Sequence, residues 1–404
     1  MYDFAIIGGG IIGLSTAMAL ANRYSRARIL LLEKENQWAY HQTGSHSGVI
    51  HSGIYYRPGS YKAKFCRAGN RSLVQFCQEH ELDHEICDKL IVATHPKELP
   101  LLQNLYDRGI QNGIPVSQIC AEEVREIEPH AHCLAGIRVR STGIVNYKQV
   151  CQKYADIAIA QGADLRLNTR VEMLVKTSEG YGIATNNGMF NTRFLINCAG
   201  LHSDRIARFT KTRPPAKIIP FRGEYYELKP EKRFLVKALI YPVPNPSLPF
   251  LGVHLTRTIE GSVQAGPNAI LSFKREGYRK TDFDLRDFSE IITYPGLWKL
   301  AVRHADEGLR EMARSFSKAL FVRSLQRLIP EVQAEDLLPA PAGVRAQALM
   351  PNGKLVDDFL IVQEASALHL CNAPSPAATA SIEIGRAIAE QASVVQPCQV
   401  AFSP

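Results

Sequence analysis

The sequence has no run of about 18 consecutive apolar residues, the length at which a helix becomes able to cross a bilayer. We therefore expect no membrane-spanning helix. The stretch Phe4–Asn22 carries no charge, but no basic segment precedes it, and its glycines and small residues fit a turn and a helix better than a signal peptide. Internal repeats and low-complexity segments are also lacking. At 404 residues the chain is long for one core, so two lobes are expected.

Cysteine pairs of the Cys-x-x-Cys type are absent, and the nine cysteines are odd in number. This argues against a disulfide framework or a zinc site and indicates reduced thiols in a cytoplasmic protein. The basic residues are dispersed, without the aromatic-rich basic stripe that is typical of nucleic-acid binding. The net charge of +8 and the pI of about 9.0 fit an acidic substrate or an anionic membrane surface, and solubility alone explains them equally well.

The N-terminus carries the most informative pattern. Phe4 to Ile7 is an apolar run of strand length, and glycines follow at positions 8, 10 and 13 with the G-x-G-x-x-G spacing. In this motif Gly8 permits a tight turn, Gly10 lets the backbone approach a pyrophosphate, and Gly13 lets the next helix lie close to the strand. The N-terminus of that helix directs free N–H groups and its positive dipole end at the phosphates.

A second apolar strand, Arg28 to Glu33, completes the unit. Glu33 comes twenty residues after Gly13, where a carboxylate accepts hydrogen bonds from the adenosine ribose and repels the 2′-phosphate of NADP. Strand, turn, helix, strand and terminal acid together predict dinucleotide binding, although the motif alone does not separate FAD from NAD.

The loop between Thr43 and Gly53 contains three glycines, four small hydroxyl side chains and two histidines. Small donors and free backbone N–H groups suit phosphate groups or the edge of a flavin, and His51 brings a titratable group to the same place. The alternatives are ordinary turn chemistry and a structural histidine.

Further along the chain, Phe194 to Gly200 is an apolar strand that ends in glycine and precedes a helix cap, which suggests that the chain rejoins the first sheet. Prolines at 242, 244, 246 and 249 predict a loop or rim. Gly308 to Ile329 has the pattern of one amphipathic helix, and Pro376 is expected at the first position of a small-residue helix.

Four segments in this order carry a family resemblance: Ile6–Gly13, Ser47–Tyr56, Phe221–Tyr226 and Pro341–Gln347, followed by the C-terminal helix. With these the chain resembles the L-2-hydroxyglutarate oxidases/dehydrogenases, within the FAD-dependent oxidoreductases that share the D-amino-acid-oxidase and glycine-oxidase fold. The first motif is generic, whereas the second and fourth are specific to this branch.

The resemblance implies an α/β fold, in which a doubly wound, Rossmann-like FAD-binding domain is joined to an α+β substrate domain built on an antiparallel sheet. The FAD-binding domain is expected at 1–85, 145–215 and 340–404, and the substrate domain at 86–144 and 216–339. The implied cofactor is FAD, and the implied reaction is oxidation of L-2-hydroxyglutarate to 2-oxoglutarate by hydride transfer to flavin N5. Another enzyme of the same fold, acting on an amino acid or glycerol-3-phosphate, is the alternative.

This chemistry needs a base for the hydroxyl proton and cations for the two carboxylates of the substrate. A neutral histidine suits the first task, and we predict His51 as the base with His254 as the second candidate. Arg345 is predicted to hold the carboxylate next to the reacting carbon. Arg222, Arg257 and Lys274 compete for the other carboxylate, and Tyr225 is expected beside them.

By the same resemblance, the C-terminal helix directs its amides at the pyrimidine end of the isoalloxazine, where its dipole stabilises negative charge. No metal is expected. The predicted cofactor-binding residues are Gly8, Gly10, Gly13, Glu33, Thr43, Ser47, Gly48, Val171, Gly200, Gly343, Ser375, Pro376 and Ala377.

The segment Lys299–Arg327 holds seven basic residues against three acidic ones. On a single helix Arg310, Arg314 and Lys318 would stack on one side, with apolar side chains largely on another. Such a helix can lie in an anionic membrane interface, which would bring the protein to the inner face of the cell membrane as a peripheral protein, with a quinone as electron acceptor. The alternative is an ordinary surface helix that packs on the substrate lobe.

Overall fold

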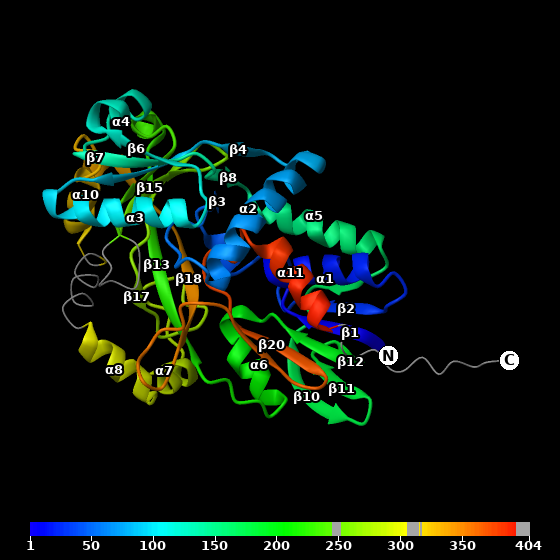
Figure 1. Ribbon diagram of the computed structural model, residues 1–404. Helices are drawn as coiled ribbons and strands as arrows, with labels where there is room; N and C mark the ends of the chain where they lie inside the picture. The colour runs from blue at the N-terminus through cyan, green and yellow to red at the C-terminus, as the bar shows by residue number, and fades with distance from the viewer. Residues whose placement is uncertain (245–251, 305–314, 316, 393–404) are drawn as a thin grey trace.

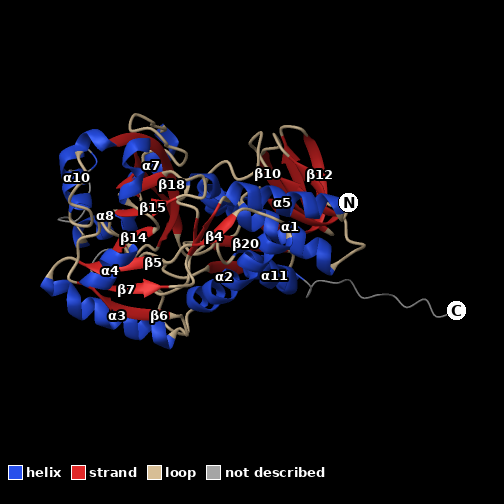
Figure 2. Ribbon diagram, turned by 90° about the horizontal axis from the view of Figure 1, so that it is seen from above, coloured by secondary structure: helices blue, strands red, loops and turns tan. Residues whose placement is uncertain are grey.

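The computed structural model describes residues 1–244, 252–304, 315 and 317–392. Two large β-sheets with helices packed on them make up two lobes that lie side by side (Figures 1 and 2). No helix within these ranges is long and apolar enough to span a bilayer.

The first sheet begins with the predicted strand–turn–helix–strand unit, which consists of β1 (Tyr2–Ile7), α1 (Ile11–Arg23) and β2 (Ile29–Leu32). Strand β1 pairs in parallel with β2 and with β12 (Gly188–Asn197), so the chain rejoins this sheet as predicted. The other strands of the sheet are β9 (Asp164–Arg166), β10 (Val171–Thr177), β11 (Gly180–Thr185), β19 (Leu360–Gln363) and β20 (Ala367–Asn372).

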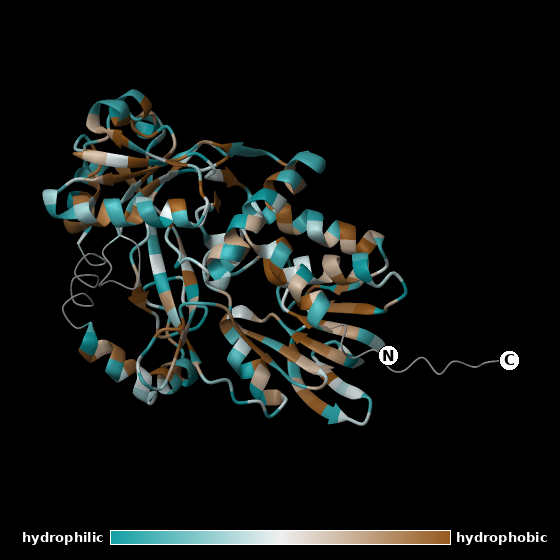
Figure 3. Cartoon of the chain, in the orientation of Figure 1, coloured by the Kyte–Doolittle hydropathy of each residue, from teal (hydrophilic) through white to brown (hydrophobic). Residues whose placement is uncertain are grey.

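Strands β1 and β2, in the middle of this sheet, are covered on both faces. Ile6 and Leu31 belong to one core cluster and Ala5 and Leu30 to another, as expected when alternate residues of a strand point to opposite faces. These two strands are therefore apolar along most of their length (Figure 3). Four helices contribute to the first core, namely α1, α2 (Tyr61–Glu79), α5 (Tyr147–Ala160) and α11 (Ser381–Gln391), and α6 (Ser203–Phe209) contributes to the second.

Helices α1 and α11 are in direct contact (Figure 1). A Cβ atom on Gly385 of α11 would lie 2.7 Å from the carbonyl oxygen of Ser15, so only glycine fits at this crossing. At the other end of the contact, Tyr24 Oη donates a hydrogen bond of 3.4 Å to the carbonyl of Ala389. The first and last described helices thus close the first lobe together.

The second sheet is antiparallel except where two of its strands, β5 and β14, pair in parallel. Its order is β17 (Ile270–Leu271), β13 (Lys217–Leu228), β16 (Val263–Gly266), β15 (His254–Arg257), β14 (Leu239–Pro242), β5 (Lys89–Ala93), β7 (Ala135–Val139) and β6 (Val116–Cys120), with β18 (Leu337–Leu349) paired to β13. The doubly wound sheet and this second, antiparallel sheet confirm the predicted fold class.

The second lobe is completed by helices around this sheet and by a small three-stranded sheet. The helices are α3 (Leu99–Gln111), α4 (Ala121–Ile127), α7 (Leu285–Ile292), α8 (Pro295–Arg303) and α10 (Lys318–Gln326), and the small sheet consists of β3 (Val49–Ile50), β8 (Gly143–Val145) and β4 (His84–Ile86). The expected domain division follows the two large sheets except at β18. Most of this strand falls in the range 340–404 that was expected in the FAD-binding domain, but β18 lies in the second sheet. The boundaries themselves stay a prediction.

Two helix predictions were wrong in detail. Helix α11 begins at Ser381 and not at Pro376, because residues 375–380 form turns that precede it. One continuous helix from Gly308 to Ile329 is excluded because Ser317 is extended and caps the start of α10 through a hydrogen bond from Leu320 N. Arg310 and Arg314 lie outside the described residues.

The proline-rich stretch behaves as predicted only in part. Strand β14 ends at Pro242, whereas positions 245–251 lie outside the described residues. Pro220, by contrast, lies inside the long strand β13 opposite Ala346 of β18. Pairing with a partner strand over eleven positions outweighs the one hydrogen bond that proline cannot donate.

Candidate active site

A cavity of about 750 Å³ is lined by residues of both lobes. From the first lobe it takes the glycine turn, the loop before β3 and the turn before α11. From the second lobe it takes residues of β13, β14, β15 and β18. This volume lies in the range of small-molecule and cofactor sites.

The glycine turn leaves space for a ligand at one position only. A Cβ atom on Gly8 would lie 2.5 Å from the carbonyl oxygen of Cys198, and one on Gly13 would lie 1.9 Å from the carbonyl oxygen of Gly8. A Cβ on Gly10 would meet nothing closer than Thr43 Oγ1 at 3.5 Å. Protein atoms therefore explain the glycines at 8 and 13, whereas the open space beside Gly10 fits an approaching pyrophosphate.

The start of α1 at this turn is suited to an anion. Gly10 is its N-cap and offers no side-chain hydrogen bond, and the first turn contains no acidic residue. Thr43 Oγ1 accepts from Ile11 N at 3.2 Å. The N-terminus of a helix of 13 residues without a side-chain N-cap provides N–H groups and positive partial charge to phosphate. These residues fit the diphosphate of a dinucleotide.

Glu33 is buried at the end of β2 and stabilises the turn. Its Oε2 accepts from Gly9 N at 2.7 Å and its Oε1 accepts from Glu35 N at 2.9 Å. Because a carboxylate has about four acceptor positions, capacity remains for a ribose hydroxyl on the cavity side. The ribose contact stays a prediction.

Most of the predicted cofactor residues line the cavity. They are Gly8, Gly10, Glu33, Thr43, Ser47, Val171, Gly200, Gly343, Ser375, Pro376 and Ala377. Gly13 and Gly48 do not line it. Gly48 instead shapes the loop, because its φ of +73° favours glycine and a Cβ there would lie 2.8 Å from the carbonyl oxygen of Val145.

Arg345 and Tyr225 reach the cavity from the paired strands β18 and β13. The Arg345 guanidinium hydrogen-bonds to Tyr225, although burial dominates and raises the pKa of the phenol. Gly343, two residues before Arg345, approaches the loop before β3 so closely that a Cβ would lie 2.5 Å from the carbonyl oxygen of Ser45. The structure thus places Arg345 where strand and loop meet at the cavity wall.

Both predicted histidines line the cavity and are neutral near pH 7. Burial lowers the pKa of His254 to about 3, and its Nδ1 lies 2.9 Å from the carbonyl of Gly252. A carbonyl only accepts, so Nδ1 carries the proton and Nε2 is the acceptor. Burial, with Lys89 and two histidines nearby, holds the pKa of His51 well below its usual value. Its ring makes no hydrogen bond within the described part of the chain.

The three candidates for the second carboxylate are not brought to the cavity lining. Arg222 is buried and donates to the carbonyl of Arg279 and to Glu224 Oε1, at 2.9 and 3.2 Å. Arg257 forms an ion pair with Glu85. Lys274 does not line the cavity either.

An aromatic group beside His254 was not predicted from the sequence. The ring of Tyr241 stacks on that of His254 with centroids 3.9 Å apart, and the Lys89 ammonium lies 3.9 Å from the Tyr241 centroid and 4.9 Å from that of Tyr55. Tyr55 belongs to a segment that carried the family resemblance. Lys89 could have been found in the sequence as a charged residue at the start of an otherwise apolar strand.

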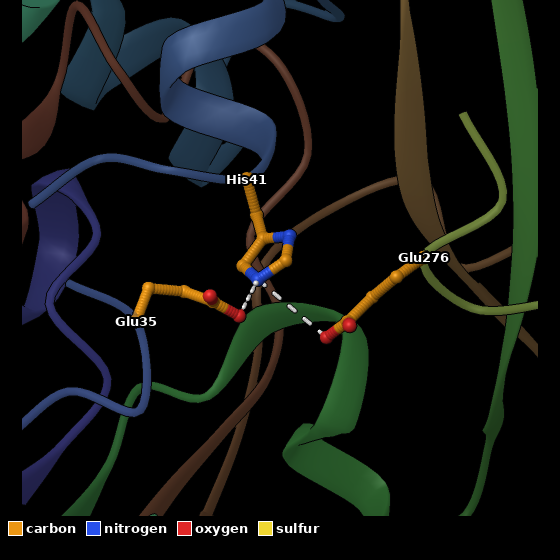
Figure 4. A group of neighbouring side chains, drawn as sticks. All are labelled: Glu35, His41 and Glu276. Atoms are coloured by element: carbon orange, nitrogen blue, oxygen red, sulfur yellow. Dashed lines mark hydrogen bonds and ion pairs between the residues drawn. The ribbon is translucent and has the colours of Figure 1, made fainter. Parts of the chain in front are cut away.

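Glu35 and Glu276 converge on His41, which lines the cavity (Figure 4). His41 Nε2 lies 3.0 Å from Glu35 Oε1 and 3.5 Å from Glu276 Oε1. The spacing suits a metal ion, but Lys34 already forms ion pairs with both carboxylates, and its pKa is raised because the hydrogen bonds to Glu276 and Glu35 outweigh its burial. We therefore interpret the group as an ion-pair network that joins the loop after β2 to the loop after β17.

Comparison with known proteins agrees with this geometry. The chain matches a family model described as "FAD dependent oxidoreductase" over residues 3–391. It is 48% identical over 400 residues to a protein of Escherichia coli (strain K12) named L-2-hydroxyglutarate dehydrogenase, which covers 99% of this chain and 95% of that protein. A human mitochondrial protein of the same name is 44% identical over 408 residues, covering 96% of this chain and 88% of that protein.

Solved structures show the same fold at lower identity. A dithionite-reduced L-alpha-glycerophosphate oxidase from Mycoplasma pneumoniae with FAD bound superposes with a TM-score of 0.80 at 22% identity, covering 98% of this chain and 95% of that one. A glycine oxidase from Geobacillus kaustophilus gives a TM-score of 0.74 at 16% identity, covering 98% and 96%.

Proposed function

Because this chain belongs to the family of FAD-dependent oxidoreductases, we propose that it oxidises the C2 hydroxyl of L-2-hydroxyglutarate to give 2-oxoglutarate. The observation that carries the proposal is that one cavity contains the open glycine turn, the cation Arg345 and two neutral histidines. The names of relatives at 44 to 48% identity over nearly their full length supply the substrate.

When bound, FAD supplies the acceptor for the hydride that leaves C2, at flavin N5. Arg345 holds the C1 carboxylate through charge-assisted hydrogen bonds and so orients the substrate with its C2 hydrogen toward the cofactor. His51 accepts the proton of the C2 hydroxyl. Of the two histidines it has the ring without hydrogen bonds within the described ranges and the larger exposed fraction, whereas His254 is 6% exposed.

Anaerobic reduction of the bound flavin tests the proposal. L-2-Hydroxyglutarate should bleach the flavin absorbance, and the D enantiomer should not, because cofactor, base and Arg345 define three points around C2. Faster bleaching by an amino acid or by glycerol-3-phosphate would assign the protein to the alternative activity within the same fold.

We further propose that the electrons pass to a membrane quinone and that the second lobe touches an anionic membrane surface. The membrane contact is supported by helix α8, and not by the single long helix that the sequence predicted within 299–327. Trp298 and Val302, one turn apart, are 59% and 82% exposed, and the exposed Lys299 and Arg303 follow them by one position each. Apolar and basic side chains together are typical of helices that lie in a membrane interface. Helix α10 instead packs Phe321 and Leu325 into the core.

Sedimentation with liposomes tests this surface. The protein should bind vesicles that contain anionic lipid, and binding should fade with salt. Lys299→Glu/Arg303→Glu should weaken binding without slowing anaerobic flavin reduction. Equal sedimentation with neutral and anionic vesicles, or none with either, would remove α8 from the proposal.

A further inference from the structure

Each carboxylate of a buried dicarboxylate needs a cation. Six lysines and arginines line the cavity, but most of them are already paired with carboxylates of the protein. Five of the six form such ion pairs. They are Lys34, Lys62, Arg170, Arg205 and Arg286. The sixth, Arg345, hydrogen-bonds to Tyr225 and is assigned to the carboxylate beside C2. The second carboxylate therefore needs a cation from behind the wall.

Lys89 is a cation in the right place. It begins β5, and its side chain is among the largest fully buried ones, with 1% of its surface exposed. The ammonium lies against the rings of Tyr241 and Tyr55, both of which line the cavity. No carboxylate or carbonyl oxygen within the described residues pairs with it. Cation–π contact offsets only part of the cost of burying a charge.

Tyr55 provides a second, independent sign of a missing ligand group. Its Oη is buried and has no hydrogen-bond partner within the described ranges. A buried hydroxyl without a partner is destabilising, because it has lost its hydrogen bonds to water without replacement. This hydroxyl belongs to one of the two rings against which the ammonium lies, so one carboxylate can accept from both groups.

The position of this pair suits the far end of the substrate. Tyr241, against which Lys89 lies, stacks on His254. Both Lys89 and Arg345 act electrostatically on His254, so the two cations lie near the same cavity-lining histidine. A dicarboxylate with C2 near the histidines can thus have one carboxylate at Arg345 and the other at Tyr55 and Lys89.

We propose that Lys89 and Tyr55 form the subsite for the second carboxylate and so select a dicarboxylate over a monocarboxylate 2-hydroxy acid. This inference rests on the proposed oxidation of L-2-hydroxyglutarate and adds to it the residues that determine chain-end specificity. Lys89 and not Arg222, Arg257 or Lys274 is then the second clamp.

The test compares L-2-hydroxyglutarate with L-2-hydroxypentanoate, which has the same chain length and a methyl group in place of the second carboxylate. Lys89→Met keeps the length of the side chain and removes the charge. In the FAD-loaded protein it should lower kcat/KM for the diacid by about 30- to 1,000-fold, and for the monoacid by less than about threefold. Lys89→Arg should retain part of the preference for the diacid.

Two further measurements guard against a merely structural effect. Tyr55→Phe removes only the hydroxyl and should lower the diacid-to-monoacid ratio of kcat/KM by about 5- to 30-fold. Perturbation of the oxidised flavin spectrum by 2-oxoglutarate and by 2-oxopentanoate gives dissociation constants without turnover, and only the first should weaken in Lys89→Met. Lys217→Met is the matched control, since Lys217 also lies over a tyrosine ring but donates to the carbonyl of Glu290 and does not line the cavity, and the ratio should not change.

The outcomes separate this inference from the function on which it rests. If the wild-type protein is not reduced by L-2-hydroxyglutarate, the proposed function fails. If it is reduced, but Lys89→Met and Tyr55→Phe slow both substrates equally or leave the ratio unchanged, the subsite is refuted and the function stands.

Discussion

A Cβ atom on Gly13 would lie 1.9 Å from the carbonyl oxygen of Gly8, so the start of α1 touches the turn that precedes it. Gly10, between them, has no such contact. We therefore expect two neighbouring glycine substitutions to fail for different reasons. Gly10→Val should leave a folded protein that has lost FAD, because its side chain fills the space of the pyrophosphate. Flavin absorbance and circular dichroism measure the two effects.

Gly13→Ala serves as the counterpart. Its methyl group collides with backbone, so it should destabilise the fold by about 1 to 3 kcal/mol or more, seen as a lower thermal midpoint. A Gly10→Val protein that keeps stoichiometric FAD would show that the phosphates bind elsewhere.

Substitution of Arg345 should act on substrate binding. Arg345→Ala removes charge-assisted hydrogen bonds to a carboxylate in a desolvated site, and should weaken binding by about 2 to 4 kcal/mol. Arg345→Lys should recover only part of this, because an ammonium lacks the planar fork. Titration with 2-oxoglutarate against the flavin spectrum measures the change, and an unaltered dissociation constant would remove Arg345 from the site.

The two histidines can be separated by the rate of flavin reduction. His51→Asn should lower this rate by roughly 10² to 10⁴, with a smaller effect on substrate binding, because it removes the proton acceptor. His254→Asn should mainly disturb the stacking on Tyr241 and cost less. Stopped-flow anaerobic reduction compares the two, and the reverse order of effects would make His254 the base through its acceptor Nε2.

The buried Lys89 should lower the free energy of unfolding, by an amount that depends on pH. Burial lowers the pKa of Lys89 from 10.5 to about 7. Between these values the unfolded chain binds a proton that the folded protein does not, so this group makes stability rise with pH from about 7 to 10.5. At and below pH 7 the cost is fully present.

Lys89→Met should therefore stabilise the protein at pH 7 by about 2 to 4 kcal/mol after allowing for the lost cation–π contact, and the gain should shrink toward pH 10.5. Urea unfolding of the holoprotein at both pH values measures this. A variant that is less stable than the wild type at pH 7 would contradict the assignment of Lys89 as a destabilising, functional cation.

Local patterns predicted the first lobe well, because the turn at Gly8 to Gly13 and its flanking strands are encoded within some thirty residues. The start of α11 was misjudged because Pro376 suits a turn as readily as a helix start, and Gly308–Ile329 because Ser317 serves as a cap in an otherwise helical pattern. Both errors concern boundaries, where local propensity has least influence.

The aromatic group beside His254 could not be predicted from the sequence, for a different reason. The register of two paired strands determines its position. Ile91 of β5 lies opposite Tyr241 of β14, and this pairing brings Lys89 to the Tyr241 ring, 152 positions away in the sequence. Arg222 and Arg257 were chosen for their charge, but Glu224 and Glu85 neutralise them. Nothing in the sequence shows which cations are paired in the folded protein.

The contact between α1 and α11 has a consequence for how the chain reaches its native state. Tyr24 and Ala389 hydrogen-bond across 365 positions, and β1 lies between β2 and β12, so the dinucleotide-binding lobe has a high contact order. During synthesis its first helix is made early and cannot bury the face that meets α11 until nearly all of the described chain has emerged. Folding of this lobe should therefore be slow, with late chain closure, and in that interval the uncovered apolar face of α1 is open to aggregation or chaperone binding.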